Sequence, residues 1–123
     1  MTTQVDLTRP RYMNRTTWAV AIIGCEPAGP WRVIHSQQPQ QELQDIRKSQ
    51  PKTIAVAVRW CKSRELAQAI AQKIETRAAP VRAGQKLPEP LFEMTREKVV
   101  AMFTSCASLS VQDVESLKQH AQF

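Results

Sequence analysis

The chain has 123 residues, of which 42% are hydrophobic and 23% are charged. This length and composition predict one globular domain with its own core, and they exclude the class of disordered proteins with low hydropathy and high charge. The formal net charge of +6 favours an anionic partner.

Cysteine and histidine are few and widely spaced. Cys25, Cys61 and Cys106 form no C-x-x-C motif, and the only histidines are His35 and His120. We therefore expect free thiols in a reducing cytoplasm, with no disulfide framework, no metal site and no cofactor. The longest apolar run, residues 18–23, is too short for a signal peptide or a membrane span, so we expect a cytoplasmic protein without membrane contact.

Positive charge is concentrated in the middle of the chain, where residues 47–86 hold ten basic and two acidic side chains. These cations are spread over several predicted elements rather than gathered in one tail. They either form one basic face or are solvated charges on separate elements.

The predicted elements begin after a flexible basic arm over residues 1–15, which precedes a single domain over residues 16–123. Residues 17–24 and 31–36 are rich in β-branched and aromatic side chains, and the turn-forming residues between them predict a β-hairpin. In the first strand, Trp18, Val20 and Ile22 share one face.

Proline marks the start of a predicted helix in the middle of the chain. Pro39 fits the first turn of a helix over residues 39–48, in which Leu43 and Ile46 share one face. Residues 52–61 alternate and predict a third strand, with Ile54, Val56, Val58 and Trp60 on the same face.

Ser63 is a suitable N-cap for a helix over residues 64–78, with an apolar stripe of Leu66, Ile70 and Ile74. Residues 79–90 contain three prolines and Gly84, so they predict a loop. A short strand over residues 91–94, a helix from Thr95 to about Ser105 and a last helix over residues 110–120 follow. The expected fold class is α+β: a small antiparallel or mixed three-stranded sheet flanked by helices, with an extra C-terminal helix.

The order of these elements, together with the segments at residues 20–24, 29–36, 39–43 and 91–95, resembles the GIY-YIG nuclease family, particularly its small members from phages and mobile elements. The resemblance runs from about Trp18 to Cys106. It implies a metal-dependent phosphodiester hydrolase with a tyrosine on each hairpin strand, an arginine on the first helix and a later metal-binding glutamate.

The residues at those positions differ from the family pattern. Ala21 stands at the first tyrosine, Ile34 and His35 stand at the second strand's motif, and Glu42 replaces the arginine. Ala71 and Pro90 stand where the family has a polar residue and the metal-binding glutamate, although Glu89 is adjacent. Losing the arginine alone costs about 10³-fold or more in rate, so we expect a degenerate active site without catalytic residues. Residual metal-dependent nuclease activity through Glu89, or an acid–base pair of His35 with Glu89 or Glu93, is the alternative.

Two binding functions follow from this interpretation. The first is nucleic-acid binding, DNA or RNA, with phosphate contacts from Arg32, Arg47, Lys48, Lys52, Arg59 and Lys62. Trp31 and Trp60 then either stack on bases or anchor the core. The second is protein interaction, such as an inhibitor from a phage or mobile element that docks on a host complex. In that function an acidic group of residues contributes as well: Glu89, Glu93, Glu97, Asp113 and Glu115.

Overall fold

The computed structural model describes residues 5–11, 16–87 and 90–107. Its elements in chain order are β1 (Trp18–Gly24), β2 (Trp31–Ser36), α1 (Pro39–Arg47), β3 (Ile54–Cys61), α2 (Arg64–Gln85) and α3 (Arg96–Ala107). The last predicted helix, over residues 110–120, lies outside the described residues.

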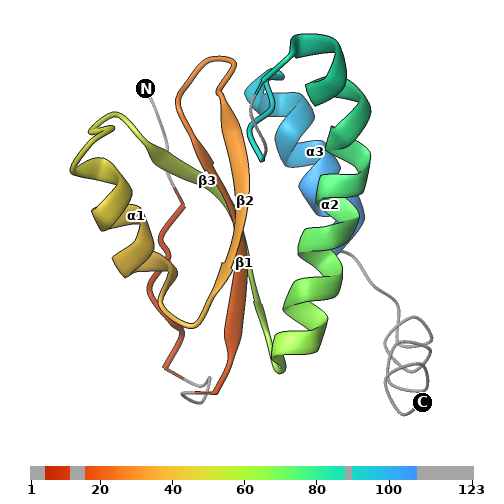
Figure 1. The fold of residues 1–123 in the computed structure, drawn as a ribbon. Helices are drawn as coiled ribbons and strands as arrows, with labels where there is room; N and C mark the ends of the chain where they lie inside the picture. Colours follow the sequence, from red (N-terminus) through yellow and green to blue (C-terminus); the bar gives the residue numbers. More distant parts are fainter. Residues whose placement is uncertain (1–4, 12–15, 88–89, 108–123) are drawn as a thin grey trace.

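The three strands form one antiparallel sheet in the order β2-β1-β3. Helix α1 lies on one face of the sheet, and α2 and α3 lie on the other (Figure 1). The α+β class expected from the sequence is therefore confirmed. The predicted short strand reduces to a single bridge, in which Phe92 and Trp31 exchange two backbone hydrogen bonds.

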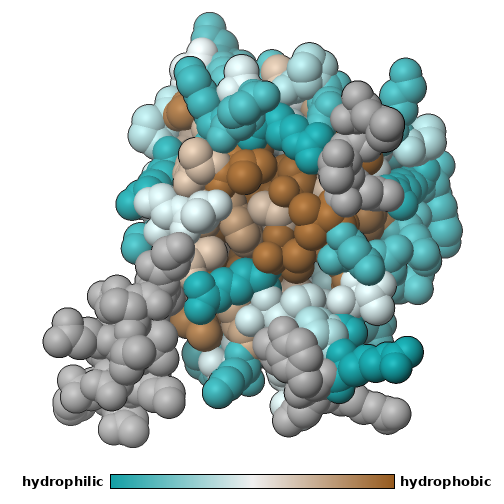
Figure 2. Space-filling model, turned by 180° about the vertical axis from the view of Figure 1, so that it is seen from behind, coloured by the Kyte–Doolittle hydropathy of each residue, from teal (hydrophilic) through white to brown (hydrophobic). Residues whose placement is uncertain are grey.

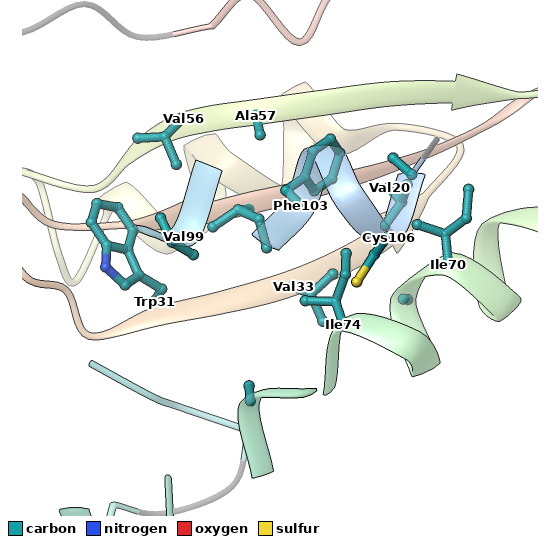
Figure 3. Close-up of a cluster of buried hydrophobic side chains, with 14 of the residues drawn as sticks. Val20, Trp31, Val33, Val56, Ala57, Ile70, Ile74, Val99, Phe103 and Cys106 are labelled. Carbon is teal, nitrogen blue, oxygen red and sulfur yellow. The ribbon is translucent and has the colours of Figure 1, made fainter. Parts of the chain in front are cut away.

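The central strand β1 is covered on both faces, as its uninterrupted apolar sequence predicts. Val20 and Ile22 belong to the larger core cluster, which includes Trp31 of β2 and Ile74 of α2 (Figure 3). A smaller cluster under α1 holds a second set of side chains: Leu7, Ala21, Ile23, Ile34, Leu43 and Ala55.

A β-bulge in β3 changes the predicted alternation. Ile22 pairs with Ala57 and Ile23 pairs with Ala55, so Val56 has no partner in β1. Val56 and Ala57 consequently both face α2 and α3, whereas Val58 turns to the α1 side. The expectation that Ile54, Val56, Val58 and Trp60 share one face is therefore wrong beyond Val56, because one extra residue inverts every side chain that follows.

Helix α2 extends to Gln85, so the loop predicted from residue 79 is wrong at its start. Pro80 is exposed within the helix, and the buried Ala78 precedes it. The helix ends at Lys86, which has a φ of 55°. The side-chain amide of Gln85 holds this end by donating to the Glu93 carbonyl at 2.6 Å and accepting from the Glu93 N–H at 2.7 Å.

Residues 5–11 of the expected arm lie against the sheet. The Val5 N–H donates to the Ala55 carbonyl at 2.8 Å, and Leu7 is only 1% exposed within the smaller cluster. Burial of this one leucine side chain stabilises the packed segment by about 2 kcal/mol. The polar composition of residues 1–15 does not reveal this contribution. The part of the chain that the structure describes has no helix suited to crossing a membrane.

Candidate nucleic-acid interface

The six cations predicted to bind phosphate are divided between the two ends of the sheet. Arg32 at the start of β2, Arg47 and Lys48 at the end of α1, and Lys52 before β3 lie at one end. Arg59 and Lys62 lie at the other end, where β3 finishes. Because the eight residues of β3 span about 26 Å, the six side chains do not form one surface.

Two of the four cations at the first end, Arg47 and Lys48, already make contacts with neighbouring residues. Arg47 Nε donates to the Thr53 carbonyl at 2.8 Å, which ties the end of α1 to the start of β3. Lys48 Nζ lies 3.4 Å from the Asp45 carboxylate, and both side chains are exposed. Arg32 lines a cavity of about 350 Å³ together with Ile46 and Thr53.

The three tryptophans occupy different environments. Trp31 is fully buried, and its indole N–H donates to the Met94 carbonyl at 2.7 Å, so it anchors the core. Trp18 and Trp60 are only partly buried. Both lie at the end of the sheet where Arg59 and Lys62 are found, because Trp18 pairs with Cys61 and Ala19 pairs with Trp60.

Trp18 is on the α2 side of this end. The guanidinium carbon of Arg64 lies 5.3 Å from the centre of the Trp18 ring, and the His35 ring centre lies 6.1 Å from it. Arg64 is placed by the start of α2, where the Ser63 hydroxyl accepts a hydrogen bond from the Leu66 N–H at 3.2 Å and caps the helix.

Trp60 is on the α1 side, where the guanidinium carbon of Arg9 lies 5.3 Å from the ring centre. Arg9 also donates through Nη2 to the Gln37 carbonyl at 2.7 Å. Its buried Nε has no hydrogen-bond partner among the described residues. Leaving a buried donor unpaired costs about 1–3 kcal/mol.

We call this region the Trp18–Trp60 end. Besides the two tryptophans, it carries Arg9, Arg59, Lys62 and Arg64, with the exposed Arg11 two residues beyond Arg9. Glu65, in the first turn of α2, brings a carboxylate close to these cations. Cations beside partly exposed aromatic rings suit nucleic acid, because phosphates take the charge and bases take the ring faces.

The sequence predicted Arg59, Lys62 and Trp60 of this group as binding residues and did not point to Trp18, Arg9, Arg11 or Arg64. The sequence places Trp18 on the same face of β1 as Val20 and Ile22. The side chain does point to that face, but it is only partly buried. Arg64 is the partner of Trp18, and the sequence signal for this contact is the short link between β3 and α2. The link runs from Cys61 to the capping residue Ser63 and brings Arg64 back over the end of the strand.

The positions that the GIY-YIG resemblance assigns to catalysis hold mostly apolar side chains. Ala21 and Ile34 are direct partners across β1 and β2 and are buried in the cluster under α1. Ala71 is buried in the larger cluster, and Glu42 is exposed on α1. Glu89 lies outside the described residues, and the neighbouring Pro90 is exposed.

The thiols of the chain are free. Burial raises the pKa of the Cys61 thiol, and the charge of Arg59 opposes this shift more weakly. Among residues 5–11, 16–87 and 90–107, no three side chains of His, Cys, Asp or Glu gather to hold a metal ion.

Comparison of the chain with protein-family models, with curated proteins and with solved structures gives no match.

Proposed function

We propose that this protein binds nucleic acid through the Trp18–Trp60 end without cutting it. One observation carries the proposal: on each face of the same sheet end, a partly exposed tryptophan has an arginine guanidinium 5.3 Å from its ring centre. Arg59 lies one residue before Trp60 in the chain, and Lys62 lies two residues after it. Such an arrangement offers phosphate contacts and stacking surfaces within one region.

The proposal excludes hydrolysis because of what occupies the family's catalytic positions. Tyrosine hydroxyls would activate water, and an arginine would stabilise the charge on phosphate. Ala21 and Ile34 supply neither group, and the carboxylate of Glu42 repels phosphate. The degenerate GIY-YIG-like scaffold is in this proposal a binding module.

Salt dependence tests the binding. If five cations at the Trp18–Trp60 end (Arg9, Arg11, Arg59, Lys62 and Arg64) each neutralise one phosphate, the logarithm of affinity falls against the logarithm of salt with a slope of about −3.5 on single strands and −4.5 on duplexes. Gel shifts with DNA and RNA over a salt series measure this slope. A flat response contradicts the proposal.

Matched double variants locate the interface. Lys62→Ala with Arg64→Ala should reduce the steepness of the slope by about 1.4 to 1.8, since each lost phosphate contact removes about 0.7 to 0.9. Lys48→Ala with Lys52→Ala removes two cations at the opposite end and should leave the slope unchanged. Equal effects of the two pairs would contradict an interface at this end. Plasmid incubated with Mg²⁺ or Mn²⁺ should stay intact.

A second candidate function, docking on another protein, is favoured by the apolar surface on the face shown in Figure 2. Ile54 of β3 and Val100 of α3 are partly exposed apolar residues that pack on the same core cluster as Val56 and Phe103. A complex of one partner with one copy of this chain that survives nuclease treatment would support this candidate. Val100→Lys should abolish that complex and leave nucleic-acid binding intact.

A further inference from the structure

A cavity of about 320 Å³ adjoins the Trp18–Trp60 end on the α1 side. It lies between the N-terminal segment and the start of α1, and its walls include Leu7, Arg9, Pro39 and Trp60. The cavity is open to solvent, and its volume is at the lower limit of small-ligand sites, which is enough for one planar ring system. The cavity therefore sits beside the proposed phosphate contacts and is the right size for one base.

The wall around Trp60 is held in place by Arg9. The guanidinium of Arg9 lies 5.3 Å from the ring centre of Trp60, and its Nη2 donates to the Gln37 carbonyl at 2.7 Å. Leu7, two residues before Arg9, is 1% exposed and fixes the segment on the sheet. Both planar groups are thus positioned by the fold, and an unstacked base can pack against an aromatic ring or a guanidinium plane.

Polar groups for reading a base edge are also present. Five glutamines line the cavity: Gln37, Gln38, Gln40, Gln41 and Gln44. Of these, Gln41 already donates through Nε2 to the Asp45 carboxylate at 3.1 Å. A side-chain amide carries both an acceptor and donors, which is the pattern that pairs with the edge of a base.

We infer that this cavity holds one unstacked base of a single-stranded nucleic acid, which packs against the Arg9–Trp60 pair and presents its edge to the amides of Gln40 and Gln44. The inference rests on the proposed function, because the phosphates of the strand bind the neighbouring cations. Duplexes keep their bases stacked and cannot enter the cavity, so single strands are the preferred ligand.

Anisotropy measurements with the full chain test the inference. The probes are labelled 12-mers of dA, dC and dT, and an abasic 12-mer that carries the same phosphates without bases. We expect at least one homopolymer to bind about 5- to 100-fold more tightly than the abasic strand. Trp60→Leu should reduce this difference, measured as the ratio of the affinity for the base-bearing strand to that for the abasic strand.

Substitutions of the cavity glutamines test the same inference if Trp60→Leu fails to fold. Gln40→Ala and Gln44→Ala should change the ranking of dA, dC and dT with the salt slope unchanged. Gln72→Ala, an exposed glutamine in α2, is the matched control and should change neither quantity. Equal binding of abasic and base-bearing strands, with a steep salt slope, would overturn the inference and leave the proposed function standing. Absence of binding by every strand would overturn both.

Discussion

The environment of each tryptophan is decided by its neighbours across the sheet rather than along the chain. Trp31 begins β2 and is enclosed by the bridge to Phe92, so its whole ring is buried. Trp60 nearly ends β3, where a bulge has turned it to the α1 side. Each ring has an arginine next to it in the chain, Arg32 after Trp31 and Arg59 before Trp60, so only the pairing distinguishes the core anchor from the surface ring.

Stability at alkaline pH should depend on Cys61. Burial raises the pKa of its thiol above the ordinary value, since a thiolate loses hydration in the core. The folded state therefore holds the proton more tightly than the unfolded chain. The stabilising contribution is fully present below the ordinary thiol pKa, and it is lost as pH rises through the raised pKa.

Urea unfolding under reducing conditions, measured at intervals from about pH 7 to pH 10 across the ordinary thiol range, checks this expectation. The free energy of unfolding should decline at alkaline pH, and Cys61→Ala should make that decline shallower. Cys25→Ala, at a less buried thiol, serves as the control. An identical alkaline decline in the wild type and Cys61→Ala would contradict the role of this thiol.

At the scale of elements, the strands and the capped helix starts could be predicted because their signals are local. β-branched and aromatic runs located β1 and β2, apolar alternation located β3, Pro39 located α1, and the Ser63 cap located α2. The bulge at Val56 has no such signal, since small and β-branched residues fit a strand with or without it. The Trp18–Trp60 end was found only in part for the same reason: sheet register and the folded N-terminal segment bring its members together.

Pro80 should weaken the second half of α2. Its nitrogen has no hydrogen to donate to the preceding turn, yet the helix continues to Gln85. Replacing it with alanine should raise the free energy of unfolding by about 1–3 kcal/mol. Urea denaturation measures this gain.

The exposed Ala83→Gly, in the same turns of the helix, should lower stability by about 1 kcal/mol and is the matched control. If neither substitution changes the unfolding midpoint, residues 79–85 are not helical in solution and the loop expected from the sequence is the better description.

The N-terminal segment, residues 5–11, contributes to both the core and the proposed interface. Leu7 fills the space between α1 and the sheet, and it is placed there by the hydrogen bond from Val5 to the free side of β3. Arg9 reaches Trp60 only because this anchor holds the chain on the α1 face. Stability and binding are therefore expected to change together when the anchor is removed.

Leu7→Ala should lower the free energy of unfolding by about 2–5 kcal/mol, as for other buried leucines. It should also reduce the steepness of the salt slope on single strands by about 0.7, because Arg9 no longer stays beside Trp60. Leu66→Ala, at a partly buried leucine in the first turn of α2, should cost less stability and leave Arg9 in place. Unchanged unfolding of Leu7→Ala would mean that residues 5–11 do not pack on the sheet, and the cavity beside Trp60 would lose its wall. A Leu7→Ala variant with normal stability but a reduced salt slope would contradict this account, because the leucine side chain affects binding only through its packing.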